Sequence, residues 1–371
     1  MFKYHNPSNI VFDTGIMDNK EKLKNLLGSG DYCIFTYGDK IFEKYCEKII
    51  QAIGEPKLII NNILPNPDYV NLKIISKTFS SKCKSIKKVI ALGGGSVIDT
   101  AKFIVLGKGD FDKTRSYLEK EVDFIEPTDI DLISIPTTAG TGSELTCWAT
   151  IWDEQNQRKH SLIHSSLFSK ISIFDSNLTL SLPKKITIET ALDAMSHAFE
   201  SVWNINSNPV SNIHAINCIK IVMDKLPKLI KDLSNLELRE EIMKASMFAG
   251  MAFSNTKTAI SHAISYPITL KYKIPHGIAC SFTLPIILKS VHGLNEICDK
   301  NFKYLFPILE EAPQQLKNFF ATIDISTNYK DYIGNANDWQ LIVKDAFVGE
   351  RGKNFIGNYK RVLQAQDALG Y

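Results

Sequence analysis

A change of pattern after Leu182-Pro183 constrains the fold of this chain most strongly. Before that point, short runs rich in β-branched and aromatic residues alternate with segments of helical periodicity, which is typical of βαβ units and a parallel sheet. After it, long amphipathic patterns dominate and strand-like runs become rare. A length of 371 residues also suggests two domains. We therefore expect an α/β domain over residues 1–183 and a helical domain over residues 184–371.

The individual elements follow from the same periodicities. The first part predicts strands over 32–36, 57–60, 88–92, 130–136 and 170–175, with a helix over 40–53. The second part predicts helices over 184–203, 208–226, 236–253 and 256–266. Residues 310–343 are weakly patterned and predict no element.

Composition and charge exclude several classes of protein. The chain has 43 basic and 40 acidic residues in mixed order, so we expect no nucleic-acid partner. Its seven cysteines form no C-x-x-C pair, which indicates reduced thiols. The N-terminus lacks an apolar signal core, and no apolar run reaches membrane-spanning length. We expect a cytoplasmic protein with no membrane partner.

A glycine-rich loop follows the third predicted strand. Gly93, Gly94 and Gly95 run into Ser96, where a helical pattern that contains Asp99 begins. Glycine allows the backbone to approach a ligand closely, and a helix N-terminus offers unpaired N–H groups and a positive dipole end. The loop is neither a Walker A loop nor a G-x-G-x-x-G fingerprint. We interpret it as a pyrophosphate-binding loop, with a simple tight turn as the alternative.

A second loop, residues 136–144, follows the fourth predicted strand. It contains Thr137, Thr138 and Ser143, whose small or hydroxylated side chains suit a polar ligand. The alternative is a polar turn in which Ser143 or Thr141 caps a helix. Loops that follow two strands of one parallel sheet converge at its carboxyl edge, where ligands bind in such folds. The two loops together predict phosphate binding more strongly than either does alone.

Four residues of the second half form a candidate metal site. Asp193 and His197 are four positions apart in a predicted helix, which puts both side chains on one face. His262 lies in a later helical pattern, and His276 stands at a turn. One carboxylate and three imidazoles suit iron(II) or zinc, and the lack of a thiolate argues against a closed structural zinc site. Because a single helix histidine is usually not a ligand, the prediction depends on the combination.

These stretches together resemble the iron-containing, group III alcohol dehydrogenases, whose relatives include glycerol dehydrogenase and dehydroquinate synthase. The resemblance runs in the family's order as far as about Leu288, and residues 351–354 are similar to the start of the family's C-terminal helix. The matching stretches are 93–102, 136–144, 175–178, 182–183, 193–200 and 275–277.

The resemblance implies a dehydroquinate synthase-like fold: a Rossmann-like parallel-sheet domain, a helical metal-binding domain and a site in the cleft between them. It implies that Asp193, His197, His262 and His276 bind the metal. It also implies a nicotinamide cofactor. The implied cofactor-binding residues are Gly94, Gly95, Ser96 and Asp99 on the pyrophosphate loop, Thr137, Thr138 and Ser143 on the second loop, and Lys159 and Leu178 near the nicotinamide.

Two positions concern the substrate. Many family members carry a second histidine four residues after the third metal ligand, and here that position is Tyr266. Its phenol, with an ordinary pKa of about 10, either donates a proton to the nascent alkoxide or packs beside Pro267. Residues 254–269 are similar to the phosphonoacetaldehyde reductase branch, which commonly has a basic residue where Lys257 stands. Lys257 either pairs with a substrate phosphonate or is a solvated lysine.

The expected activity is hydride transfer between a nicotinamide and a small aldehyde or alcohol, assisted by iron or zinc. Phosphonoacetaldehyde, reduced to 2-hydroxyethylphosphonate, is the specific candidate, and a homodimer is the expected assembly. Asp39 either binds the adenosine ribose or is displaced, leaving room for a 2′-phosphate near Lys40; we favour NADPH over NADH.

Two other functions stay open at this stage. A dehydroquinate synthase-like carbon–oxygen lyase would need several basic residues around a polyhydroxylated carboxylate, and no such set is evident in the sequence. A non-catalytic metabolite-binding protein would predict a broken ligand set, whereas all four candidate positions are intact.

Overall fold

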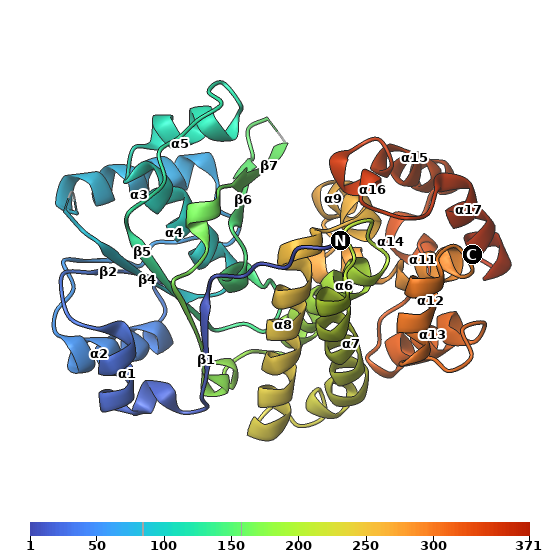
Figure 1. The fold of residues 1–371 in the computed structure, drawn as a ribbon, viewed down its shortest axis with the longest axis horizontal. Helices are drawn as coiled ribbons and strands as arrows, with labels where there is room; N and C mark the ends of the chain where they lie inside the picture. Colours follow the sequence, from blue (N-terminus) through green and yellow to red (C-terminus); the bar gives the residue numbers. More distant parts are fainter. Residues whose placement is uncertain (84, 157) are drawn as a thin grey trace. The chain divides into compact units, whose positions relative to one another are not determined.

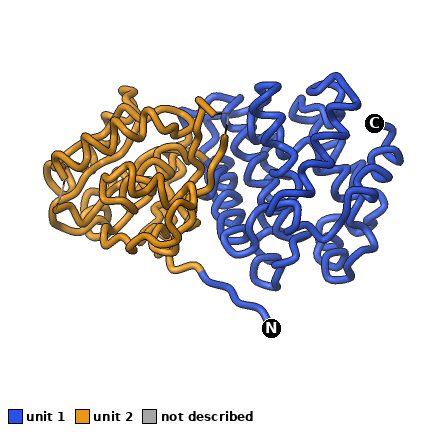
Figure 2. The backbone as a smooth tube through the Cα atoms, turned by 90° about the horizontal axis from the view of Figure 1, so that it is seen from above, with its two compact units in different colours: residues 1–5, 139–142, 180–371 blue, residues 6–138, 143–179 orange. Residues whose placement is uncertain are grey.

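The computed structural model describes residues 1–83, 85–156 and 158–371. They form two compact units, coloured separately in Figure 2. The α/β unit contains residues 6–138 and 143–179, and the helical unit contains residues 1–5, 139–142 and 180–371. Compared with the expected division after residue 183, residues 1–5, 139–142 and 180–183 also belong to the helical unit. The segment 139–142 packs closely there, because a Cβ on Gly140 would lie 2.5 Å from the carbonyl oxygen of Thr190.

A six-stranded parallel sheet forms the centre of the α/β unit, in the order β1-β8-β5-β4-β2-β3. Five of its strands match the sequence prediction to within two residues at each end, and β1 has no predicted counterpart. The strands are β1 (Asn9–Phe12), β2 (Cys33–Phe35), β3 (Leu58–Ile60), β4 (Lys88–Gly93), β5 (Asp131–Pro136) and β8 (Ile171–Phe174).

Helices cover both faces of this sheet (Figure 1). Successive strand residues point to opposite faces, so Ile34 and Ile90 join one core cluster while Phe35 and Val89 join the other. The first cluster includes residues of α1 (Lys20–Leu27) and α2 (Lys40–Ile53). The second includes residues of α3 (Tyr69–Lys82), α4 (Gly95–Gly107) and α5 (Phe111–Leu118).

An antiparallel hairpin, β6 (Trp148–Asp153) and β7 (Arg158–Ile163), was not expected from the sequence. Along β6, buried and half-buried residues alternate, as they do in a strand with one covered face. Short 3-10 helices in the described part of this unit are η1 (Ile16–Asp18), η2 (Ser143–Leu145), η3 (Ser165–Leu167) and η4 (Ser176–Thr179).

The helical unit is built around three long helices that pack on one another, α6 (Lys184–Val202), α7 (Pro209–Leu229) and α8 (Leu236–Thr256). The weakly patterned region 310–343 contains two complete helices and most of a third, joined by short non-helical segments. The remaining helices are α9 (Ile260–Tyr272), α10 (His276–Ser281), α11 (Leu284–Val291), α12 (Glu296–Lys303), α13 (Ala312–Thr322), α14 (Lys330–Ile333), α15 (Ala336–Ala346), α16 (Glu350–Lys353) and α17 (Tyr359–Ala368).

Helix α9 differs from the prediction of a helix over 256–266. It begins later, at Ile260, because Thr256 still belongs to α8 and Lys257, with φ +66°, ends that helix. At the start of α9 the carboxylate of Glu200 accepts hydrogen bonds from the main-chain N–H groups of Ala259 (2.8 Å) and His262 (3.0 Å). An acceptor supplied by another helix thus satisfies N–H groups that have no partner within α9. The helix also continues through Pro267 to Tyr272, since a proline removes one hydrogen bond without always ending a helix.

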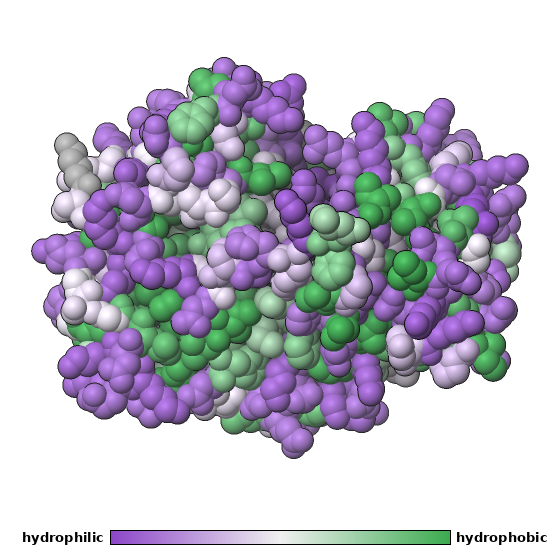
Figure 3. Space-filling model, in the orientation of Figure 1, coloured by the Kyte–Doolittle hydropathy of each residue, from purple (hydrophilic) through white to green (hydrophobic). Residues whose placement is uncertain are grey.

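None of the helices in the described ranges is long and apolar enough to cross a membrane. On the face drawn in Figure 3, hydrophilic residues are interspersed with smaller hydrophobic areas.

Candidate functional site

The four predicted metal ligands, which we call the ligand cluster (Asp193, His197, His262 and His276), come from three helices. Asp193 and His197 lie on α6, His262 on α9, and His276 is the first residue of α10. Close packing of α10 on α6 requires a glycine, because a Cβ on Gly277 would lie only 1.8 Å from a main-chain oxygen of α6. That contact fixes His276 beside Asp193.

Each of the three histidines has a ring nitrogen within 3.9 Å of one oxygen of Asp193, but the group of mutually close ligand atoms contains Asp193, His262, His276 and Cys280 and leaves His197 out. Asp193 Oδ1 lies 3.4 Å from His262 Nε2, 3.8 Å from His197 Nε2 and 3.9 Å from His276 Nε2. Ligands on one ion with bonds of about 2.1 Å are separated by roughly 3 to 4 Å. Asp193, His197 and His262 are buried, and His276 is half-buried.

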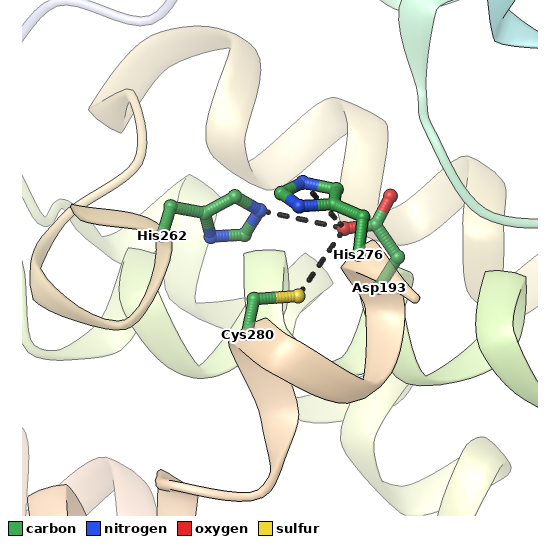
Figure 4. Close-up of side chains that lie close together, drawn as sticks. All are labelled: Asp193, His262, His276 and Cys280. Carbon is green, nitrogen blue, oxygen red and sulfur yellow. Dashed lines mark hydrogen bonds and ion pairs between the residues drawn. The ribbon is translucent and has the colours of Figure 1, made fainter. Parts of the chain in front are cut away.

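Cys280 also lies at this site, although the sequence pattern did not identify it. Its Sγ is 3.5 Å from Asp193 Oδ1, and Figure 4 shows Cys280, His262 and His276 directed toward this oxygen of Asp193. One ligand atom from each of these four residues falls within 4.8 Å of the others. The signal available in the sequence is the spacing, since Cys280 follows His276 by four positions on a short helix.

A buried carboxylate orients one of the rings. Glu200 lies 2.7 Å from His262 Nδ1, so that Nε2 is the nitrogen turned toward Asp193. Metal-binding histidines almost always donate their second ring N–H to a carboxylate, carbonyl or water in this way. His197 is held differently, by stacking on the rings of Phe253 (centroids 3.9 Å apart) and His262 (4.5 Å).

The electrostatics of the cluster suit a cation. Burial would raise the pKa values of Asp193 and Glu200, but the neighbouring imidazoles and hydrogen bonds hold both below their ordinary range. Burial lowers the pKa of His197 to about 4, whereas for His262 the two carboxylates outweigh burial and raise the pKa to about 8. Two buried charged carboxylates thus face several ring nitrogens.

The donor set fits a divalent metal ion. The Nε2 atom of His262 is buried, has no hydrogen-bond partner and faces the Asp193 carboxylate. A buried polar atom left without a partner is costly unless something binds it. A carboxylate with three imidazoles is the ligand chemistry of iron(II) or zinc.

A second group with ligand chemistry lies in the α/β unit and fits a metal less well. Glu119, Asp153 and His160 each place a ligand atom within 4.8 Å of the others. However, Glu119 accepts a hydrogen bond from Arg115 Nε (3.2 Å), and Asp153 accepts one from Asn156 Nδ2 (2.7 Å). The guanidinium would also repel a cation.

Tyr266 and Lys257, the two residues predicted to act on the substrate, differ in solvent exposure. Tyr266, half-buried on α9, stacks on His276 with ring centroids 6.0 Å apart, and burial raises its pKa to about 12 against the opposing charge of Arg351. Lys257 is exposed at the C-terminal end of α8, with φ +66°. Tyr266 therefore contacts a predicted metal ligand.

The two predicted loops, which we call the nucleotide loops (residues 93–96 and 136–144), lie side by side at the carboxyl ends of neighbouring strands. Gly93 pairs with Pro136, and Thr137 N donates to Gly93 O at 3.1 Å. A Cβ on Gly94 would lie 3.3 Å from the side chain of Thr138. Helix α4 begins at Gly95, so the N-terminus of α4 lies at this edge of the sheet.

Several predicted cofactor residues make contacts within the protein. Ser143 Oγ donates to Asp99 Oδ1 (2.5 Å), and Asp99 Oδ2 accepts from Thr150 N (2.9 Å). The buried Lys102 donates to Ser143 O (2.6 Å) and Thr146 O (2.8 Å). Asp99 and Lys102 thus tie the end of the second loop to α4. Sequence reasoning did not assign this role, because the partners are more than 40 positions apart.

The other predicted cofactor residues have distinct surroundings. Ser96 Oγ accepts from Asn66 N at 3.1 Å, and Lys159 lies over the ring of Trp152 at 5.1 Å. Leu178 is only 2% exposed and belongs to the core beside α1 and α2. Asp39 is exposed at the start of α2, and its carboxylate makes no capping hydrogen bond.

Comparison with known proteins agrees with this arrangement. The family model described as "Iron-containing alcohol dehydrogenase" matches residues 7–176. The model described as "Fe-containing alcohol dehydrogenase family, C-terminal" matches residues 187–366. The chain is similar to the structure of a sulfoacetaldehyde reductase from Bifidobacterium kashiwanohense in complex with NAD+, with a TM-score of 0.88, 26% identity, and coverage of 100% of this chain and 98% of that one.

Two curated relatives illustrate the sequence similarity. The protein named "Probable alcohol dehydrogenase EutG" of Escherichia coli is 38% identical over 201 residues, which are 54% of this chain and about half, 50%, of that relative. The sulfoacetaldehyde reductase of Bilophila wadsworthia is 31% identical over 94% of this chain and 93% of the relative. The chain belongs to the iron-containing alcohol dehydrogenase family.

Proposed function

We propose that this protein is a metal-dependent, nicotinamide-linked reductase of small aldehydes that also runs in the alcohol-oxidising direction. The observation that carries the proposal is the convergence of three imidazole nitrogens within 3.4–3.9 Å of one oxygen of Asp193. Family membership supports the same chemistry.

The residues of the ligand cluster, with Glu200 behind His262, would hold the metal. When bound, a divalent ion supplies Lewis-acid polarisation of a carbonyl, and a reduced nicotinamide supplies the hydride. The stack of His276 on Tyr266 orients the phenol ring beside a predicted metal ligand. Lys102 and Asp99 hold the second nucleotide loop in place against α4.

We propose that the preferred aldehyde carries a phosphonate or a sulfonate. The similarity to a protein named sulfoacetaldehyde reductase over most of both chains favours a sulfonate, and residues 254–269 favour a phosphonate. Both groups are tetrahedral oxyanions that a cation such as Lys257 could recognise.

For the cofactor we propose NADH, which reverses the preference for NADPH that the sequence suggested. Asp39 follows β2 and presents an exposed carboxylate that is not used in capping α2. A carboxylate at this place in such folds hydrogen-bonds the ribose of NAD and repels a 2′-phosphate. The similar structure in complex with NAD+ supports this choice.

Replacement of His262 by alanine tests the function. We expect His262→Ala to lose bound iron or zinc together with aldehyde reduction, whereas His292→Ala, a half-buried histidine outside the site, keeps both. Metal content by plasma mass spectrometry and oxidation of NADH are the measurements. Full activity of a metal-free variant would overturn the proposal. One NADH consumed per aldehyde also separates a reductase from a lyase that regenerates its cofactor.

A further inference from the structure

The ring of Tyr266 contacts both His276, a predicted metal ligand, and the guanidinium of Arg351. The ring of Tyr266 is nearly parallel to that of His276, with an interplanar angle of 8° and centroids 6.0 Å apart. The guanidinium carbon of Arg351 lies 4.7 Å from the centre of the same Tyr266 ring. A cation over an aromatic face is stabilised by the ring quadrupole. A fixed positive charge is therefore held one aromatic ring away from a predicted metal ligand.

Arg351 is positioned by contacts that also shape the start of α9. Its Nε donates to Thr258 Oγ1 at 3.0 Å, and Asn354 Nδ2 donates to Thr258 O at 2.8 Å. Asn354 O in turn accepts from Ile205 N, just after α6, at 2.8 Å. The guanidinium is thus anchored to the segment that connects α8 with α9. A side chain held in this way loses little further entropy on binding a ligand.

Lys257 offers a different kind of charge. It precedes Thr258 and is exposed, whereas Arg351 is half-buried against Tyr266. A lysine is a flexible point charge, while the planar guanidinium matches two oxygens of a tetrahedral oxyanion at once. Lys257 is the neighbour of Thr258 in the sequence, and Arg351 donates a hydrogen bond to the Thr258 hydroxyl. Of these two cations, Arg351 is the one that lies over the Tyr266 ring, which contacts His276.

We propose that Arg351 binds the phosphonate or sulfonate group of the aldehyde whose carbonyl oxygen faces the ligand cluster, and that Tyr266 acts mainly as the platform for this guanidinium. The inference rests on the proposed function. It assigns selectivity for anionic aldehydes to Arg351, with Lys257 in a weaker, attractive role.

The test compares aldehydes of the same shape and different charge. Phosphonoacetaldehyde and sulfoacetaldehyde are each paired with 3,3-dimethylbutanal, in which a neutral tert-butyl group replaces the oxyanion. We expect Arg351→Met to lower kcat/KM for both anionic aldehydes by about 10- to 100-fold, the range for a hydrogen bond to a charged group. Reduction of 3,3-dimethylbutanal should change less than about threefold, and Arg351→Lys should recover part of the loss.

Two further variants and a binding measurement control the result. Lys353→Met changes an exposed lysine of the same helix and should leave every rate unchanged. Lys257→Met should reduce the anionic rates less than Arg351→Met does. Ethylphosphonate and ethanesulfonate, which have no carbonyl, should inhibit the wild-type enzyme competitively and lose affinity in Arg351→Met, while the metal content stays constant.

Two outcomes would overturn the inference. An equal loss for charged and neutral aldehydes in Arg351→Met would indicate a structural role, and a selective loss only in Lys257→Met would assign the oxyanion to the lysine. Failure of the proposed function looks different, because the wild-type, metal-loaded protein would then reduce none of the three aldehydes.

Discussion

In the ligand cluster, charged and ring side chains from three helices meet, and each is oriented by a partner, such as Glu200 behind His262. In the nucleotide loops, the close contacts are made by the main chain and by small residues, and the supporting side chains stand behind them. The ligand cluster requires particular charged and ring side chains. The nucleotide loops require small residues that leave room for close main-chain contacts. Substitutions should therefore damage the two sites by different physical routes and independently of each other.

A reciprocal pair of glycine substitutions tests that independence with the largest expected effects. In Gly277→Ala the new Cβ must move α10 away from α6, because it would otherwise lie 1.8 Å from Glu189 O. We expect metal affinity to fall more than about 10-fold, equivalent to ~1.4 kcal/mol, with NADH binding kept. In Gly94→Val the new side chain would crowd Thr138 on the neighbouring loop. For this variant we expect the opposite result, with weaker NADH binding and unchanged metal content.

Metal analysis and NADH fluorescence titration, with circular dichroism as the folding control, measure this pair. Loss of both ligands in either variant would show that the two sites are not independent.

Substitution of Glu200 by glutamine sharpens the description of the ligand cluster. The amide keeps the shape but removes the charge that holds His262, so metal affinity should fall by about 10- to 100-fold. Saturating metal should restore most of the activity. Glu241→Gln, which alters an ion pair with Lys244, serves as the matched control. Unchanged metal affinity in Glu200→Gln would mean that the hydrogen bond does not support the metal.

Substitution of Asp39 by alanine tests the nucleotide side. If its carboxylate repels a 2′-phosphate, Asp39→Ala should raise the ratio of kcat/KM for NADPH over NADH by about 10-fold, equivalent to ~1.4 kcal/mol. Aldehyde specificity should not change. A wild-type preference for NADPH would contradict the assignment directly.

The smallest effect is expected at Tyr266. Tyr266→Phe keeps the ring that stacks on His276 and underlies Arg351, so kcat should change less than about fivefold, or ~1 kcal/mol. A fall of more than about 100-fold in steady-state reduction, with metal retained, would instead identify the phenol as the proton donor.

The same contrast explains what the sequence could predict. Side-chain types and helical spacing selected Asp193, His197, His262 and His276. In the structure all three histidines lie near Asp193, but Cys280 takes the place of His197 in the group of mutually close ligand atoms, so the four-ligand set stays a prediction. The residues that contact the ligand cluster were harder to predict from the sequence. Cys280 carries only an i, i+4 spacing, and Glu200 lies within a matched stretch without showing which ring it would contact.

On the nucleotide side, the glycine pattern predicted where the chain turns but not which side chains support the turn. Asp99 and Ser143 were assigned to the cofactor, yet they hydrogen-bond each other across 44 positions of sequence. Strand β1 and the β6–β7 hairpin were not predicted, although β6 and β7 are longer than the predicted strands β2 and β3, whereas the long helix α6 was predicted within one residue.

The central claim is that Asp193 and three imidazoles bind one divalent ion. Anomalous X-ray diffraction at the zinc or iron edge, on crystals of the metal-loaded protein, tests it most directly. We predict a single strong peak in the helical unit, about 2.0–2.2 Å from Asp193 Oδ1 and from Nε2 of His197, His262 and His276. A peak bonded to Cys280 with His197 turned away, or no peak among these residues, would contradict the account.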